Sequence, residues 1–393
     1  MTSLNVRWKL KKTNLKRYIN SKYLSFLNGL WKRDSFFSFS LLQKIIFLFL
    51  CACEKFYLIG FRIDQLLKKR RVSQFPLKII SVGNLSTGGV GKSVFVRFLV
   101  ENLDLASSIV LRGYRGKNEK NKRSFLVSDG QNVFCDVNFA GDEAFMFCSL
   151  LKVPVVIGAS KNLSCELLVD FSRKREKKID CVILDDGYQS SYIKKDAEIL
   201  LLDARRPFGN EHCIPAGPLR EKDLSRANLI VFTHSDEVNK SKLLEIQKLI
   251  FKKNFRKPVF FGKHVCKSFL DSDLNKVSKY TFKKKKVLIF AGIGSFSSFF
   301  DTAKNIGINI VFPISYPNHH SYTIEDIEYI IKCFERCGAD SILTTQKDWH
   351  KISSLISKFE DKKLYFYSLD IDFEFLYKDN HCNFFNLLVP MLK

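Results

Sequence analysis

A glycine-rich segment followed by a lysine and a serine is the part of this sequence that points most directly to chemistry. It reads Ser-Thr-Gly-Gly-Val-Gly-Lys-Ser from Ser86 to Ser93, between an apolar run at 77–82 and an amphipathic run at 94–103. Such runs predict a strand before the segment and a helix after it. Glycines let backbone N–H groups turn inward around an anion, and the new helix adds its positive end. The segment is therefore expected to cradle a phosphate.

The residues of the predicted cradle have separate roles. Lys92 is expected to reach the β- and γ-phosphates of a nucleotide, and the Ser93 hydroxyl to bind Mg²⁺. The pattern G-x-x-x-x-G-K-[ST] is met except at its first glycine, where this chain has Ser86, and a chance glycine-rich turn is the alternative. The residues expected to contact the phosphates are Gly88, Gly89, Val90, Gly91, Lys92 and Ser93.

Two adjacent carboxylates, Asp185 and Asp186, end the apolar run 182–184. An acid at the carboxyl end of a strand beside a phosphate loop can hold Mg²⁺ directly or through water. An ordinary Asp-Asp-Gly turn is the competing interpretation. Beside the glycine-rich segment, the metal role is favoured.

Asp142 and Glu143 open a helical stretch, 144–151, where carboxylates commonly satisfy the free N–H groups of a helix start. The alternative is that Asp142 accepts the proton of an attacking hydroxyl. His319, in a loop after Pro317, is expected to assist it, although a solvated loop histidine is the more common finding. Because an ordinary Asp has a pKa near 3.9, we expect burial or hydrogen bonding to raise the pKa of Asp142.

The loop 214–221 contains two prolines and ends in Arg220 and Glu221. A rigid loop of this kind can present Arg220 to a phosphate for bidentate contact. The alternative is a turn with a surface ion pair.

Short apolar runs recur between helical patterns from residue 77 onward, which is typical of parallel doubly wound sheets. The fold class predicted is α/β, with two such lobes preceded by an N-terminal apolar helix. We divide the chain into a basic arm at 1–34, a membrane-interface helix at 35–71, a P-loop lobe at 72–251, an interlobe connection at 252–286 and a second α/β lobe at 287–393.

The first 71 residues suggest contact with a membrane surface. Nine Lys and Arg residues and no acid lie in 1–33, followed by a strongly apolar segment whose uninterrupted part, 45–53, is too short to span a bilayer. Wound as a helix, Lys44, Lys55 and Arg62 form one narrow basic stripe, which suits a helix lying in the interface; a helix buried against the first lobe is the alternative.

Composition narrows the choice of partners and compartment. The chain has 393 residues and a net charge of +24, which favours polyanionic partners such as phosphorylated substrates, anionic lipids or nucleic acid. Its 11 cysteines form no C-x-x-C pair and suit a reducing compartment, and no cleavable signal peptide is apparent.

Nine short motifs, taken together and in this order, resemble the tetraacyldisaccharide 4′-kinase family of lipid A biosynthesis. They are Val-Gly-Asn-Leu at 82–85, Gly-Gly-Val-Gly-Lys-Ser at 88–93, Arg-Gly-Tyr at 112–114, Gly-Asp-Glu at 141–143, Asp-Asp-Gly-Tyr-Gln at 185–189, Phe-Gly-Asn at 208–210, Ile-Pro-Ala-Gly-Pro-Leu-Arg-Glu at 214–221, Ala-Gly-Ile-Gly at 291–294 and Thr-Thr-Gln-Lys-Asp at 344–348. The likeness covers about residues 77 to 370.

The resemblance implies transfer of the γ-phosphate of ATP, with Mg²⁺, to the 4′-hydroxyl of a tetraacylated glucosamine disaccharide 1-phosphate. It implies a monomeric protein, peripheral at the cytoplasmic face of the bacterial inner membrane and without a nucleic-acid partner. The implied catalytic residues are Asp142, His319 and Lys92, and the implied metal ligands are Ser93, Asp185 and Asp186. The implied substrate contacts are Asn84, Arg112, Tyr114, Glu143, Gln189 and Arg220.

Three positions depart from the family pattern: Ser190 replaces a histidine, Asn318 an aspartate and Gln346 an acid. A basic P-loop ATPase switch acting on nucleic acid or membrane is the alternative function, but Thr87 stands where such switches carry a signature lysine. A GTPase is a third hypothesis, for which Thr-His-Ser-Asp at 233–236 is a poor match to a base-reading motif.

Overall fold

The computed structural model describes residues 29, 31, 40–69, 72–114, 116–120, 123–252, 257–363 and 365–393. The chain forms two compact units. The first comprises Met1–Lys68, Leu85–Gly88 and Arg206–Asp223, and the second comprises Lys69–Asn84, Gly89–Arg205 and Leu224–Lys393. The basic arm predicted for 1–34 lies outside the described residues, apart from positions 29 and 31.

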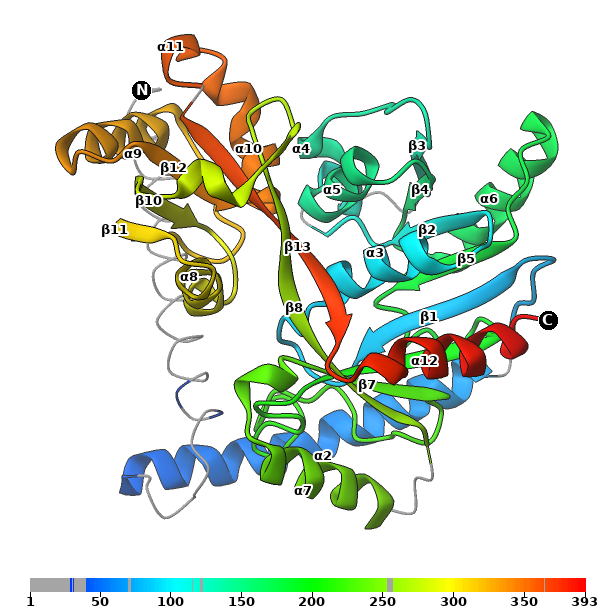
Figure 1. The fold of residues 1–393 in the computed structure, drawn as a ribbon. Coiled ribbons are helices and arrows are strands. Elements are labelled where there is room, and N and C mark those ends of the chain that lie inside the picture. Colours follow the sequence, from blue (N-terminus) through cyan, green and yellow to red (C-terminus); the bar gives the residue numbers. More distant parts are fainter. Residues whose placement is uncertain are drawn as a thin grey trace, which may run out of the picture. The chain divides into compact units, whose positions relative to one another are not determined.

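One mixed sheet, in which parallel pairs predominate, runs through the second unit (Figure 1). Its order is β11-β10-β12-β13-β8-β7-β6-β1-β5-β2-β4-β3, with β9 beside β8, and only the pairs β3–β4, β8–β9 and β8–β13 are antiparallel. The strands are β1 (Lys78–Asn84), β2 (Ser107–Leu111), β3 (Phe125–Asp129), β4 (Pro154–Ile157), β5 (Cys181–Asp185), β6 (Ala197–Asp203), β7 (Leu229–Thr233), β8 (Val259–Leu270), β9 (Lys276–Val277), β10 (Lys286–Ala291), β11 (Asn309–Ser315), β12 (Ser341–Thr345) and β13 (Phe366–Phe375). The fold is therefore mixed α/β, which confirms the predicted class at this level.

Helices of the second unit cover both faces of this sheet, whereas helix α2 (Leu41–Lys69) belongs to the first unit. The α-helices are α2 (Leu41–Lys69), α3 (Lys92–Asn102), α4 (Val137–Ala140), α5 (Asp142–Leu150), α6 (Lys161–Arg175), α7 (Lys240–Lys252), α8 (Phe296–Asn305), α9 (Ile324–Arg336), α10 (Gln346–Ile356), α11 (Glu360–Lys363) and α12 (Lys378–Met391). The 3₁₀ turns are η2 (Lys117–Lys120), η3 (Ser235–Glu237) and η4 (Lys279–Phe282).

Alternate residues of each buried strand pack into different cores, because successive side chains of a strand point to opposite faces. In β1, Ile80 and Val82 pack with residues of α3, α5 and α12, whereas Ile79 packs with residues of α6. In β10, Leu288 and Phe290 pack with residues of α9 and α10, whereas Val287, Ile289 and Ala291 pack with residues of α8. This alternation holds the carboxyl ends of β1, β5 and β12 firmly.

The segment 252–286, predicted as a connection, contains a long strand that the sequence does not signal. Its strand β8 pairs in parallel with β7 through Val259 to Phe261 and then antiparallel with β13 from Gly262 to Leu270, so one sheet passes through the segment (Figure 1). Much of β8 is only half-buried and includes His264 and Lys267. The sequence of β8 therefore lacks a continuous apolar run of the kind that marks the buried strands.

Helix α2 of the first unit falls within the range predicted for an N-terminal helix. Phe47 and Leu50 are buried with Ala216, and the Tyr57 hydroxyl donates a hydrogen bond of 2.9 Å to the carbonyl oxygen of Arg220. The opposite side of the helix is apolar and exposed. None of the helices that the structure describes is both long and apolar enough to cross a membrane.

Candidate active site

The glycine-rich segment joins the central strand β1 to helix α3, as the sequence predicts. Gly91 is the N-cap residue of α3 and adopts φ 78°. A Cβ at this position would lie 2.2 Å from Cε1 of His264 on β8, so the turn requires glycine for both conformation and space. At Gly89 a Cβ would meet no atom within 4 Å. Gly88 belongs to the first unit and Gly89 to the second.

Lys92 and Ser93 begin α3 and point to the neighbouring strand ends. The Nζ of Lys92 donates to Oδ1 of Asn84 at 3.0 Å and lies 3.3 Å from Oδ1 of Asp186. The Ser93 hydroxyl donates to Oε1 of Glu143 at 3.1 Å. The side chain of Val90 is buried in the core, so only its backbone is available to a ligand.

The two acids at the end of β5 lie beside a lysine that sequence reasoning did not find. Lys161, the first residue of α6, is buried and its Nζ donates to the backbone carbonyl oxygens of Asp185 and Asp186, the latter at 2.6 Å. Burial lowers the pKa of Lys161 to about 8. Burial and the nearby Glu143 charge raise the pKa of Asp185 to about 6.

Asp142 and His319 meet although they are far apart in the chain. Nδ1 of His319 lies 3.0 Å from Oδ2 of Asp142, and Nζ of Lys351 lies 3.3 Å from the same oxygen. Gly141, at φ 88°, lets the start of α5 approach the carbonyl oxygen of Tyr114, from which a Cβ would be only 2.7 Å away. The first residue of α5 is thereby fixed opposite the loop that carries His319.

The pKa expected for Asp142 is wrong in direction. Burial alone would raise this pKa, but the hydrogen bond with His319 and the charges of Lys347 and Lys351 hold it far below its ordinary value. The carboxylate is therefore ionised at neutral pH and can only accept hydrogen bonds. It follows that Nδ1 of His319 carries the proton of the 3.0 Å bond.

A second link joins α5 to α10. Nζ of Lys347 lies 2.6 Å from Oε1 of Glu143 and 3.2 Å from the Ser93 hydroxyl oxygen. The Lys347 charge is the main reason that the pKa of Glu143 is lowered. Lys347, Lys351 and the buried Asp348 all come from one turn of α10, so this helix supplies counter-charges to both acids of α5.

Comparison with known proteins decides the family. The family model described as tetraacyldisaccharide-1-P 4′-kinase matches residues 46–387. The chain belongs to this family. The curated tetraacyldisaccharide 4′-kinases of Halothermothrix orenii and Elusimicrobium minutum are 31% and 32% identical, covering 85% and 77% of this chain and 90% and 81% of their own lengths. A crystal structure titled the "apo" form of LpxK from Aquifex aeolicus in complex with ATP has a TM-score of 0.66 at 26% identity, covering 87% of this chain and 98% of that one.

The chain is thus an ATP-dependent 4′-kinase of the lipid A disaccharide precursor, a transferase that uses Mg²⁺ as the usual partner ion of ATP. The alternative of a P-loop switch acting on nucleic acid is not favoured. The residues of the site fit both ATP and Mg²⁺. Beside Gly89 the backbone leaves room that no side chain fills. The buried Oδ1 of Asp185 has no hydrogen-bond partner within the described part of the chain, as suits a metal-binding oxygen.

The remaining kinase residues predicted from the sequence lie in different surroundings. Tyr114 is half-exposed, with its ring centroid 5.9 Å from that of His319, and the Gln189 amide donates to the carbonyl oxygen of Asn84 at 3.0 Å. Arg112 is exposed and pairs with Glu119 at 3.4 Å. Arg220 belongs to the first unit, where its backbone N–H donates to the carbonyl oxygen of Leu85.

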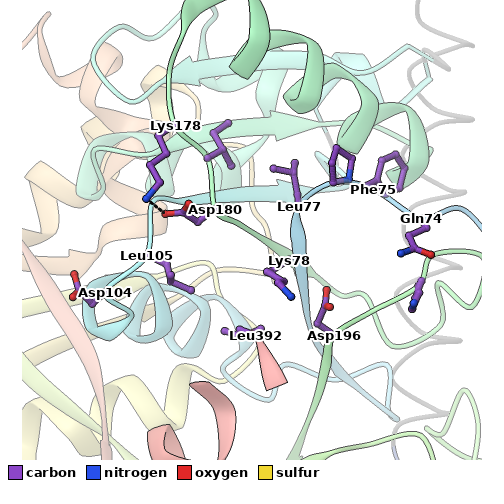
Figure 2. A pocket seen from close by; sticks show the side chains of 13 residues that line it. Gln74, Phe75, Leu77, Lys78, Asp104, Leu105, Lys178, Asp180, Asp196 and Leu392 are labelled. Atoms are coloured by element: carbon purple, nitrogen blue, oxygen red, sulfur yellow. Dashed lines mark ion pairs between the residues drawn. The ribbon is translucent and has the colours of Figure 1, made fainter. Parts of the chain in front are cut away.

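The kinase also has a cavity of about 550 Å³ at the amino-terminal ends of several strands, away from the candidate active site (Figure 2). It is lined by residues at or near the starts of β1, β5 and β6, including Lys78, Asp180 and Asp196, whereas the site above lies after the carboxyl ends of β1 and β5. Its acids are engaged in structure: Asp196 accepts the N–H of Ile79 at 2.7 Å, and Asp180 that of Ala106 at 3.1 Å. These bonds account for the charged lining without a ligand.

Proposed function

We propose that Asp142 and His319 act as one proton-accepting pair when this kinase transfers the γ-phosphoryl group to the 4′-hydroxyl. Oδ2 of the ionised Asp142 accepts the Nδ1–H of His319 and so orients the imidazole ring, and in this proposal Nε2 of that ring takes the hydroxyl proton. As the oxygen–phosphorus bond forms, this proton passes to Nε2 and the bond to the ADP leaving group breaks. The 3.0 Å contact between the two side chains is the observation that carries the proposal.

The phosphate side of the reaction falls to the glycine loop and the acids after β5. In this proposal Gly88 to Gly91 and the charge of Lys92 bind the phosphates, and Ser93, Asp185 and Asp186 hold the metal. When bound, Mg²⁺ neutralises charge on the phosphates. Lys161 fixes the turn of Asp185 and Asp186 through their carbonyl oxygens.

The acceptor side is assigned to the substrate contacts that the family resemblance implies. Tyr114, Arg112, Asn84, Glu143, Gln189 and Arg220 are the proposed substrate contacts. For Arg220 the support is local: its loop contains two prolines, and its backbone carbonyl accepts the Tyr57 hydroxyl of α2. A rigid loop suits bidentate contact with a substrate phosphate.

A peripheral position at the cytoplasmic face of the inner membrane is part of the same proposal. The exposed apolar side of α2, with Lys44, Lys55 and Arg62 along one edge, has the pattern of a helix that lies in a bilayer interface. We propose further that the protein is a monomer. Its domains in this proposal are a P-loop kinase lobe at 72–251, a connection at 252–286 and a second lobe at 287–393.

Kinetics of single and double variants test the proton-accepting pair. Asp142→Asn and His319→Ala should each lower kcat far more than they raise the KM for ATP, because neither group is assigned to ATP binding. The double variant should lose little beyond the worse single one, since the two residues act as a unit.

The adjacent histidine provides a matched control. Nε2 of His320 bonds Asp326 at 2.9 Å, at the start of α9, so His320→Ala should keep kcat near normal. A normal kcat for His319→Ala would contradict the proposal, and so would losses that multiply strictly in the double variant.

A further inference from the structure

Lys347 is a half-buried charge at the site, and neither the sequence motifs nor the reaction scheme above gives it a role. It is the second residue of α10 and reaches across to α3 and α5. Its ammonium group lies 2.6 Å from Glu143 Oε1 and 3.2 Å from the Ser93 hydroxyl. An ammonium group has three N–H donors, so these two contacts leave one donor for a ligand.

The place of Lys347 between two assigned groups indicates what that ligand is. On one side is Ser93, whose hydroxyl would hold the Mg²⁺ that accompanies ATP. On the other is Glu143, whose neighbour Asp142 holds His319 on the acceptor side. A group between the metal-binding hydroxyl and the proton acceptor lies where the transferred phosphoryl group must pass.

The charge of Lys347 is well supported in this position. Although burial disfavours the ammonium form, Glu143 and Asp142 raise the pKa of Lys347 above its ordinary value. The contact with Glu143 also restrains a long side chain that would otherwise lose rotamer entropy on binding a ligand. A fixed cation of this kind stabilises charge that develops on a phosphoryl group.

We propose that Lys347 is a second nucleotide-contacting lysine, which binds the γ-phosphate of ATP from α10 while Glu143 orients it. This inference rests on the proposed assignment of the glycine loop and Ser93 to the nucleotide. It adds a contact specific to the triphosphate and makes α10 part of the nucleotide site.

Binding of ATP and ADP, measured by calorimetry on the full chain with Mg²⁺ and without lipid acceptor, tests the inference. Loss of one charged contact costs about 10- to 100-fold in affinity, so Lys347→Met should raise the Kd for ATP by that factor. The Kd for ADP should change by less than about threefold, because ADP lacks the contacted group. Lys347→Arg should recover part of the ATP affinity.

Lys332→Met on α9 is the matched control, since it removes the same charge from an exposed position. If Lys347→Met shows no cooperative thermal unfolding transition, Lys347→Gln is measured in its place. Equal weakening of ATP and ADP, or unchanged ATP affinity, would overturn the inference. Lys92→Ala separates the two proposals, because it should weaken both nucleotides; if it weakens neither, the glycine-loop assignment itself fails.

Discussion

At the scale of single residues, the acids of the site are shifted in opposite directions by their neighbours. Asp142 is held in its charged form by His319 and by Lys347 and Lys351. Asp185 is buried with an unpartnered oxygen among the described residues, and its pKa rises to about 6. In the proposed mechanism, the first acid orients His319 and the second would hold the metal ion. This divergence is typical of catalytic sites.

Lys92→Ala should lower kcat by about 10²- to 10⁴-fold, the range for loss of an electrostatic contact that strengthens in the transition state. The fold should be retained, because the Lys92 Nζ contacts Asn84 and Asp186, which are residues of the site and not of the core. Steady-state kinetics on the lipid acceptor, with thermal melting as the folding control, give the result. Turnover near that of the unchanged enzyme would remove the glycine loop from the mechanism.

The site residues predicted from the sequence are those whose residue types rarely occur together at that kind of position in a chain. Glycines before Gly-Lys-Ser and paired acids at a strand end are such signals, and they located Lys92, Asp142 and Asp185. Lys161 and Lys351 gave none, because lysine is abundant throughout this chain, and Lys347 lay in the motif at 344–348 without a role that the sequence could assign. Their roles depend on which helix starts meet, which only the folded chain determines. The pKa of Asp142 was misjudged for the same reason, since its lysine partners lie more than 200 residues away.

At the scale of elements, an ion pair fastens α3, which begins at the glycine loop, to β13. The guanidinium group of Arg97 donates from Nη1 and Nη2 to the two carboxylate oxygens of Asp370, and both side chains are buried. Ser268 on β8 donates to the same carboxylate at 3.1 Å. The orientation of α3, and so of Lys92 at its start, therefore depends on the antiparallel pair β8–β13.

Asp370→Asn should destabilise the protein by about 3 kcal/mol, because it leaves the buried Arg97 with only Glu101 as a charged partner. Glu374→Gln on the same strand is the matched control. It breaks an exposed pair with Lys263 at 3.6 Å and should cost less than about 1 kcal/mol. Chemical denaturation measures both free energies of unfolding, and equal losses would show that the buried pair adds nothing.

Elements with long apolar runs were predictable, whereas half-buried ones were not. Strands β2, β5, β6, β7, β10 and β12 are buried on both faces, and their sequences therefore contain continuous apolar runs. Strands β8, β11 and β13 carry exposed or charged residues between buried ones, and their pattern is weaker. The continuity of the sheet through β8 was missed because it depends on this strand changing partner, a feature without a local sequence signature.

At the scale of the whole molecule, a net charge of +24 and the exposed apolar side of α2 both favour contact with an anionic membrane surface. The large apolar side chains exposed on α2 recur at helical spacing. They are Leu41, Leu42, Ile45, Leu48, Phe49, Phe56, Ile59, Ile63, Leu66 and Leu67. Exposed apolar stripes of this length are unusual on soluble proteins and suit burial at a lipid interface. The basic charge adds attraction to anionic headgroups.

Replacing Phe49 and Phe56 together by Glu should therefore weaken binding to vesicles of anionic phospholipid by at least about 100-fold, the value of two buried aromatic side chains. Both side chains are more than 60% exposed, so the fold should be retained. Leu244→Glu on α7, also exposed, is the matched control and should leave binding unchanged. High salt should release the unchanged protein only partly, because ions screen the basic contacts but not apolar burial. Complete release by salt, or undiminished sedimentation of the double variant with vesicles, would show that α2 does not enter the interface.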